Sequence, residues 1–163
     1  MNRSEIDAKY QWNLADIFPS DEAWEEAFTK VSEMPDFASY RGKLTTAENV
    51  LSFLKCQDAY EIELLRVYLY AFLRNAQDES VTKYISYLGK VSMLMTKISS
   101  ETAFALPELT SLPDETLVAF SKDPSLSDYD TMFLRLLQEK KYVLSEKEER
   151  ILALSQEALQ VSG

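Results

Sequence analysis

Acidic side chains are the most abundant groups in this sequence that could do chemistry. Asp and Glu total 27 against 17 Lys and Arg in 163 residues, a formal net charge of −10. Carboxylate pairs such as Asp58 with Glu61 could act as a general acid and base. At this density, however, neighbouring carboxylates on helix faces arise by chance, and no pair is set apart from the others. We therefore assign no catalytic residue in this chain.

The chain contains no histidine, and Cys56 is its only cysteine. This composition excludes Ser-His-Asp and Cys-His catalytic groups and the usual histidine sites for zinc or di-iron. Three scattered glycines cannot form a phosphate-binding loop, and no calcium-binding loop of the Asp-x-Asp-x-Asp-Gly type occurs. Cys56 lies in an apolar helical pattern and is predicted to be a buried thiol. The residues alone thus predict neither a metal site nor a cofactor site.

Charge and hydropathy limit the partners and the location of the protein. A strongly anionic surface repels nucleic acid and anionic lipid, so neither is an expected partner. The N-terminal residues lack the hydrophobic core of a signal peptide. The longest apolar run, 67–73, is far shorter than the roughly 20 residues of a membrane-spanning helix. These features predict a cytoplasmic protein.

The elements that position these side chains are expected to be helices. Residues 46–74 and 81–106 carry apolar side chains at spacings of three and four, and a polar stretch, 75–80, separates them. They predict a long antiparallel helical hairpin, whose second helix should end before Pro107 because the residue preceding a proline resists helical geometry. The aromatic run 67–73 would also suit a strand. The predicted fold is all-α, a hairpin with shorter packed helices.

Capping signals predict where the helices begin and end. Ser20 can accept a backbone N–H at the start of a helix that ends before Pro35. Gly42 is expected to close a short helical turn in the left-handed conformation. Thr45 and Glu48 form a capping box for the first long helix. Further short helices are predicted after Pro113, around Phe133 and after Ser145.

The first residues follow a different pattern. Tyr10, Trp12 and Leu14 alternate with polar residues, which places three large side chains on one side of an extended segment. We interpret residues 1–19 as an extended N-terminal arm that lies across the helices, with a true strand as the alternative. Residues 20–163 are predicted to form a helical domain.

Several segments of the chain, in this order, carry a family resemblance. They are YQWNLADIFPS at 10–20, Trp24, YRGKL at 40–44, VYLYA at 67–71 and LSEKEE at 144–149. They resemble the N-terminal region of oligoendopeptidase F and its relatives. Members of this family are cytoplasmic zinc metallopeptidases that cut short peptides inside a deep, mostly helical cavity.

The resemblance does not supply any catalytic residue. The family holds zinc through an HExxH helix and a downstream glutamate, and no histidine exists here to match that motif. The resemblance therefore implies the non-catalytic N-terminal domain of a longer zinc metalloendopeptidase, a domain that walls the substrate cavity. The implied partners are the missing catalytic domain of the same polypeptide and short peptides. Zinc is implied for the full-length enzyme only, and this chain alone is expected to be inactive.

Four residues of the first long helix are our candidates for facing the missing part or the peptide cavity. They are Tyr68, Tyr70, Phe72 and Arg74. The alternative is that all four are ordinary core or surface positions. For the whole chain, the alternative is an independent acidic helical module that binds or scaffolds other proteins.

Overall fold

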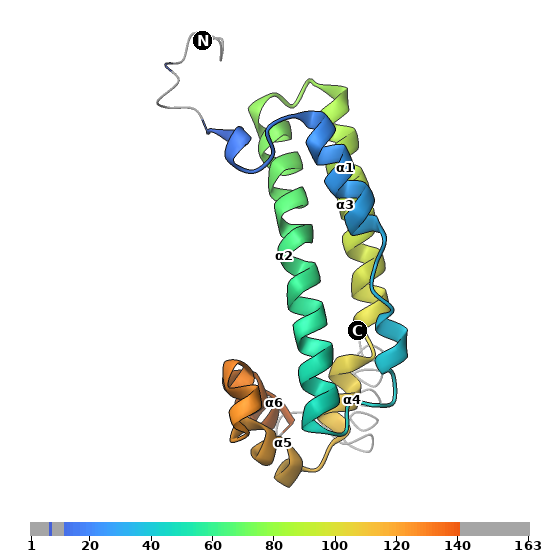
Figure 1. Ribbon diagram of the computed structural model, residues 1–163, viewed down its shortest axis with the longest axis vertical. Coiled ribbons are helices and arrows are strands. Elements are labelled where there is room, and N and C mark those ends of the chain that lie inside the picture. The colour runs from blue at the N-terminus through green and yellow to red at the C-terminus, as the bar shows by residue number, and fades with distance from the viewer. Residues whose placement is uncertain (1–6, 8–11, 141–163) are drawn as a thin grey trace, which may run out of the picture. The chain divides into compact units, whose positions relative to one another are not determined.

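The computed structural model of the chain describes residue 7 and residues 12–140 (Figure 1). Every element in this part is an α-helix or a 3-10 turn, and no strand occurs in it, which confirms the all-α prediction. The chain divides into two compact units. Unit 1 contains the described residues up to Arg41 together with Ser52–Phe104, and unit 2 contains Gly42–Leu51 together with the described residues from Ala105 onward.

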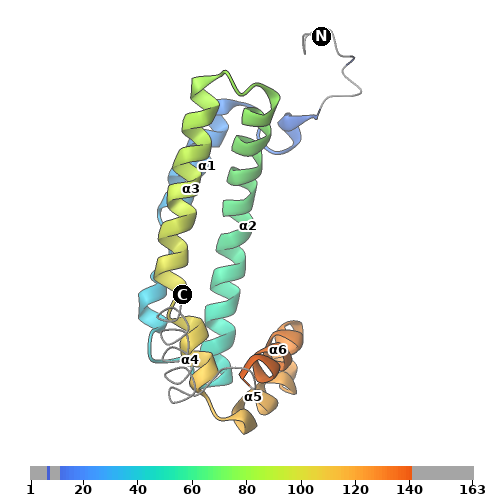
Figure 2. The ribbon, with the colours of Figure 1, turned by 180° about the vertical axis from the view of Figure 1, so that it is seen from behind.

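Unit 1 is built on the predicted hairpin. Helix α2 (Ala47–Gln77) and helix α3 (Thr82–Thr102) run side by side in opposite directions, joined by a short turn (Figures 1 and 2). Helix α1 (Asp21–Ser32) lies against one side of the pair. The aromatic run 67–73 lies wholly inside α2, so it is helical and not a strand.

Long-range hydrogen bonds hold α1 to α2 in the core of unit 1. The Trp24 indole N–H donates to the carbonyl of Val67 at 2.8 Å, and the Tyr60 hydroxyl donates to the carbonyl of Val31 at 2.6 Å. The Trp24 ring has no exposed surface and stacks on Tyr87 with ring centroids 3.8 Å apart. Burial of an aromatic ring with its polar group paired is strongly stabilising, so Trp24 is a central anchor of this unit.

Unit 2 gathers short helices around a small core of its own. Its helices are α4 (Ala105–Ser111), α5 (Asp114–Ser121) and α6 (Asp130–Lys140), with a 3-10 turn at Pro124–Tyr129. Leu44, Leu117, Leu126 and Phe133 are fully buried in this unit. The helices predicted after Pro113 and around Phe133 are therefore confirmed, whereas the one after Ser145 lies outside the described residues.

Two local predictions for the helices are confirmed. Ser20 caps α1, since its hydroxyl oxygen accepts the N–H of Ala23 at 3.3 Å. Gly42 has a φ of +75°, the left-handed conformation predicted for it. The cap of α2 differs from the prediction, because Thr46 and not Thr45 accepts the N–H of Asn49, at 3.3 Å.

The segment predicted as one helix over 81–106 is interrupted. Helix α3 ends at Thr102, and after a turn at 103–104 the new helix α4 begins at Ala105 and continues through Pro107. Helix α3 does end before Pro107, as predicted, but the proline is not what ends it, because Pro107 lies in the first turn of α4. A proline is tolerated there, since the N–H groups of a first helical turn have no intrahelical acceptor.

The N-terminal arm that was predicted to be extended contains a helical turn. Leu14–Asp16 form a 3-10 turn, and the backbone N–H groups of Ile17 and Phe18 both donate to the carbonyl of Leu14. This turn brings Leu14 and Phe18 into the core, while Trp12 remains 55% exposed. The period-two pattern therefore did not predict which side chains dock, and Tyr10 lies outside the described residues.

None of the described helices combines the length and the apolar character that crossing a membrane requires.

Candidate functional site

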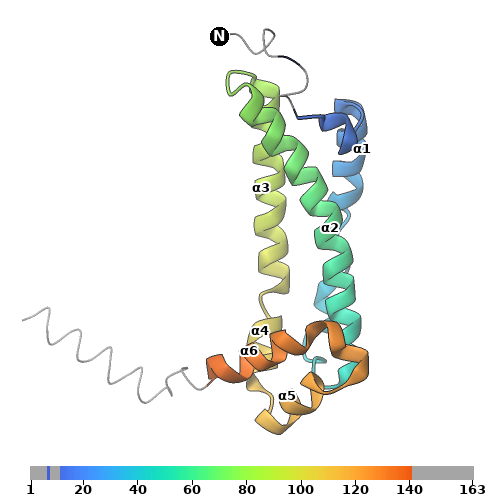
Figure 3. The ribbon, with the colours of Figure 1, turned by 90° about the vertical axis from the view of Figure 1, so that its left-hand side faces the viewer.

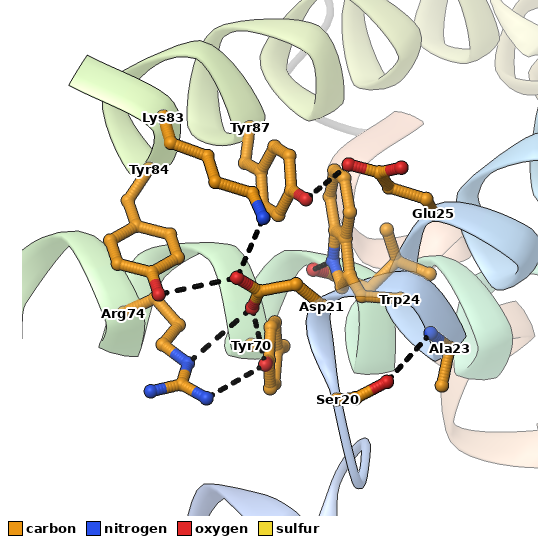
Figure 4. A network of polar contacts seen from close by, with 11 residues as sticks. Ser20, Asp21, Ala23, Trp24, Glu25, Tyr70, Arg74, Lys83, Tyr84 and Tyr87 are labelled. Atoms are coloured by element: carbon orange, nitrogen blue, oxygen red, sulfur yellow. Dashed lines mark hydrogen bonds and ion pairs between the residues drawn. The ribbon is translucent and has the colours of Figure 1, made fainter. Parts of the chain in front are cut away.

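Polar side chains from all three helices of unit 1 converge on Asp21, the first residue of α1 (Figure 4). Asp21 Oδ1 accepts a hydrogen bond from the Tyr70 hydroxyl at 2.7 Å and lies 3.8 Å from Arg74 Nε. Asp21 Oδ2 lies 2.9 Å from Lys83 Nζ and accepts a hydrogen bond from the Tyr84 hydroxyl at 3.3 Å. We call these five residues the Asp21 cluster.

The sequence builds this cluster from three local arrangements. The Ser20 cap fixes the start of α1, where a carboxylate is favoured by the positive end of the helix. Tyr70 and Arg74 lie one turn apart near the end of α2, and the Tyr70 hydroxyl accepts from Arg74 Nη2 at 3.0 Å. Lys83 and Tyr84 lie in the first turn of α3. The antiparallel hairpin brings these two helix ends together.

A second polar contact follows one turn along α1 and α3. The Tyr87 hydroxyl donates a hydrogen bond to the Glu25 carboxylate (Figure 4). Burial, together with this hydrogen bond, raises the pKa of Tyr87 to about 12. The phenol therefore stays protonated at neutral pH and can donate its proton in the hydrogen bond to Glu25.

The electrostatics of the cluster keep Asp21 ionised, Lys83 protonated and Tyr70 a neutral phenol. Burial alone would raise the pKa of Asp21, but hydrogen bonds from Lys83 and Tyr70 outweigh it and lower that pKa. The hydrogen bond to Asp21 raises the pKa of Lys83 above its ordinary value. Burial and the hydrogen bond to Asp21 raise the pKa of Tyr70. Each of these shifts moves the pKa further from pH 7. The cluster is therefore suited to joining helices and not to proton transfer at pH 7.

One cation of the cluster is incompletely paired. Arg74 Nε is buried and has no hydrogen-bond partner among the described residues, since its 3.8 Å separation from Asp21 is too long for a hydrogen bond. The guanidinium lies over the rings of Tyr70 and Tyr84, 5.1 and 5.6 Å from their centroids. Cation–π attraction at these distances partly compensates the missing hydrogen bond.

The structure separates the four residues predicted to face a cavity or another domain. Tyr70 and Arg74 belong to the Asp21 cluster, where Tyr70 has no exposed surface in this chain. Tyr68 and Phe72 stack on each other elsewhere on α2, with ring centroids 5.8 Å apart, and Phe72 is 43% exposed. That these residues face a cavity or a missing domain stays a prediction.

Sequence reasoning did not find Asp21, Lys83 or Tyr84 as a group. Asp21 was one of 27 acidic residues and was not singled out among them as a site residue. The pairs it forms with Tyr70 and Tyr84 are separated by 49 and 63 residues along the chain. The available signal was the hairpin itself, because an antiparallel pair places the last turn of one helix beside the first turn of the next.

Two grooves flank α2 within unit 1. The α1–α2 groove, about 670 Å³, is lined by residues such as Ala27, Val31 and Ala59, with Lys30 and Arg66 among its charged groups. Cys56 also lines it and is half-buried, so the prediction of a buried thiol is only partly met. The α2–α3 groove, about 700 Å³, is lined by Ile62, Leu65 and Tyr68 from α2 and by Met95, Ile98, Ser99 and Thr102 from α3, with Gln57, Asp58, Glu61 and Leu64 completing the set.

The donor atoms of this chain do not fit a zinc site of the family type. The sequence has no histidine. Across residue 7 and residues 12–140, no three Cys, Asp or Glu side chains are grouped so that they could hold a metal ion. Zinc sites in proteins are built mainly from histidine nitrogen and cysteine sulfur.

Comparison with known proteins gives a consistent set of relatives. A protein-family model described as Oligopeptidase F, for the N-terminal part of this peptidase family, matches residues 108–163. Oligopeptidase PepF of Bacillus subtilis is 38% identical over 161 residues, which cover 97% of this chain and 24% of that protein. Group B oligopeptidase PepB of Streptococcus agalactiae is 33% identical and is matched over 99% of this chain and 28% of its own length.

Solved structures agree with these sequence matches. The crystal structure of a Chlamydophila abortus protein assigned as a peptidase matches 98% of this chain and 27% of its own, with a TM-score of 0.80 and 26% identity. The crystal structure of oligoendopeptidase-F from Enterococcus faecium matches 88% of this chain and 29% of its own, with a TM-score of 0.66 and 26% identity. The chain spans about a quarter of the length of these relatives. The resemblance stated from the sequence is confirmed: the chain matches an N-terminal region of the oligoendopeptidase F family.

Proposed function

We propose that this chain is the non-catalytic N-terminal domain of an oligoendopeptidase F-like zinc metalloendopeptidase that hydrolyses short peptides. One observation carries the proposal. The match covers 97% of this chain but only 24% of Bacillus subtilis PepF, so most of the relative has no counterpart here. The zinc ligands and the catalytic glutamate of the enzyme would come from that remaining part, because this chain has no histidine to contribute.

In this proposal the helices of unit 1 form part of the wall around the substrate cavity. A wall that admits only short, unfolded peptides must be rigid, and the Asp21 cluster and the Trp24 anchor hold α1 to the hairpin. The catalytic domain of the same polypeptide and short peptide substrates would be the partners of this domain. The location proposed for the enzyme is the cytoplasm, as the resemblance implies.

A chimera tests the proposal. The matched quarter of Bacillus subtilis PepF is replaced by this chain, and hydrolysis of fluorogenic peptides is measured for PepF, for the chimera and for PepF lacking the matched quarter. The chimera is expected to cleave short peptides and to spare long unfolded chains. The deletion variant is expected either to lose activity or to accept longer substrates.

Two results would count against the proposal. A folded chimera that cleaves no peptide would favour an independent interaction module. A deletion variant that keeps the full activity and the length limit of PepF would show that the region does not wall the cavity. Circular dichroism of each protein separates these results from misfolding.

A further inference from the structure

The flank of α2 that carries the α2–α3 groove is not covered by α1. Ala59, Tyr60 and Glu63 of α2 line the groove shared with α1, whereas Ile62, Leu65 and Tyr68 line the α2–α3 groove. In Figure 1 α1 lies on the viewer's side of α3, and Figure 2 shows it behind α3 when the hairpin is seen from the back. Figure 3 shows the same arrangement from the side.

The uncovered flank is apolar and exposed. On α2, the exposed fractions are 60% for Ile62, 53% for Leu65, 37% for Leu69 and 43% for Phe72. These four positions follow spacings of three and four, so they form one continuous stripe along the helix. Met95 of α3, which is 42% exposed, borders the same groove. A contiguous exposed apolar stripe of this kind marks an interaction surface.

The charges at the rim specify the chemistry of the partner. Asp58 and Glu61 line the α2–α3 groove, and among the described residues that line it there is no Lys or Arg. The α1–α2 groove differs, since Lys30 and Arg66 lie beside its carboxylates. The α2–α3 groove is therefore suited to a segment that combines apolar side chains with positive charge.

We propose that an amphipathic helix with Lys or Arg along one edge packs into the α2–α3 groove. It would come from the part of the polypeptide that follows this chain, so the inference rests on the function proposed above. Helices α1, α2 and α3 would then gain a fourth helix, and Tyr68 and Phe72 would lie at the contact between the two parts of the enzyme.

The relatives support this source for the occupant. This chain spans 24% of Bacillus subtilis PepF and 27% of the Chlamydophila abortus structure, so about three quarters of such an enzyme is available to supply the helix. A second copy of this chain is a poorer occupant, because its net charge of −10 would meet another acidic rim. Ridges-into-grooves packing of a fourth helix would bury the stripe that α1 leaves open.

Thiol protection tests the groove directly. Leu65→Cys is introduced together with Cys56→Ala, both in the isolated 163-residue chain and in the chimera with PepF. The rate of modification by a bulky maleimide is followed by mass spectrometry of the peptide that contains residue 65. We expect modification to be at least about tenfold slower in the chimera. Ile62→Cys provides a second position, and Met93→Cys, at an α3 residue that is 76% exposed and outside this groove, should react equally in both proteins.

A charge test addresses the edge of the partner helix. In the chimera, Asp58→Lys combined with Glu61→Lys is expected to restore rapid modification of the Leu65→Cys thiol. Glu63→Lys reverses a charge on the same helix, at a residue that lines the other groove and pairs with Arg66, and should leave protection unchanged. If the Leu65→Cys thiol is equally protected in the Asp58→Lys/Glu61→Lys variant and in the Glu63→Lys variant, the partner helix does not carry the proposed basic residues along its edge.

The remaining outcomes separate this inference from the proposed function. A chimera that cleaves short peptides but leaves the residue 65 thiol as reactive as in the isolated chain overturns the inference and keeps the function. Protection in an inactive chimera supports the inference alone. Protection that appears in the isolated chain and grows with concentration identifies a second copy as the occupant and overturns the proposal. The proposal is also overturned if, in the chimera, the Met93→Cys thiol is protected as strongly as the Leu65→Cys thiol.

Discussion

Four side chains from α2 and α3 converge on the carboxylate of Asp21. Hydrogen bonds to a charged group contribute about 1.5–3 kcal/mol each in favourable cases, more than bonds between neutral groups. The side chain of Lys83 is 46% exposed, and exposed ion pairs contribute little because water and salt screen them. The hydroxyl of Tyr70, which is buried, should therefore contribute more than the ammonium group.

Replacing Asp21 by Asn should lower the free energy of unfolding by about 1–3 kcal/mol at pH 7. The amide would keep the shape of the side chain but lose the charge that orients Tyr70 and Lys83. Urea denaturation followed by circular dichroism measures the change. Glu26→Gln is the matched control, since it removes an exposed carboxylate from the same helix and should change stability by less than about 0.5 kcal/mol.

The effect of Asp21 should also depend on pH. Its pKa is lowered in the folded state, so the ionised carboxylate stabilises the fold fully above the ordinary carboxyl range of about pH 4. This stabilisation is lost as the pH falls through the lowered pKa, where the folded state takes up the proton. The difference in stability between the parent and Asp21→Asn should therefore be constant from pH 7 to about 5 and shrink below about pH 4. A difference that stays constant down to pH 3 would contradict this assignment.

Phe18 is the side chain through which the N-terminal segment docks. Its ring is 7% exposed, meets Tyr70 edge to face at 5.6 Å and lies under the Arg66 guanidinium. Phe18→Ala should cost about 3–5 kcal/mol and lower the melting temperature, as expected for a buried phenylalanine. Trp12→Ala, at a position 55% exposed, should leave the melting temperature nearly unchanged. If the two variants lose equal stability, the alternating pattern of the sequence is the better guide to docking.

At the scale of elements, the sequence predicted the helices that local signals define. The Ser20 cap and the long unbroken periodic segment placed α1 and α2 within a few residues of their observed bounds. The break at residues 103–104 was missed because a proline in a first helical turn and a proline beyond a helix end look alike in sequence. The 3-10 turn at Leu14–Asp16 was missed because Trp12 and Leu14 also fit an extended pattern.

Two glycines should respond to alanine with opposite signs. Gly42 has a φ of +75°, and its N–H donates to Glu108 at 2.5 Å, so Gly42→Ala strains the left-handed turn and should cost about 1 kcal/mol. Gly89 lies within α3, and an added Cβ there would meet nothing within 4 Å. Gly89→Ala should therefore stabilise by about 0.5–1 kcal/mol. Chemical denaturation of both variants checks the pair, and a loss of stability at residue 89 would argue against an exposed helical site.

At the scale of the whole molecule, the polar groups serve to hold helices together. The Asp21 cluster was predictable only in part, because sequence reasoning selected Tyr70 and Arg74 but could not pair them with Asp21, which lies 49 positions before Tyr70. The apolar stripe on α2 was visible only as part of the apolar side chains that recur at spacings of three and four over residues 46–74. Which face of α2 is covered by α1 depends on tertiary packing, so it could be seen only in the structure.

The amino-acid composition of the chain leads to a prediction about its activity. The purified 163-residue chain should neither bind zinc tightly nor hydrolyse peptides, although the proposed full-length enzyme should do both. Tight zinc sites need several converging nitrogen or sulfur ligands, and this chain offers one cysteine and no histidine. Without a bound metal there is no activated water at neutral pH, and the shifted pKa values of Asp21 and Tyr87 leave neither group suited to act as a base there. Calorimetry at submicromolar free zinc, combined with a fluorogenic-peptide assay before and after a chelator, measures both properties. Stoichiometric tight binding, or cleavage that the chelator abolishes, would mean that this chain carries a site of its own.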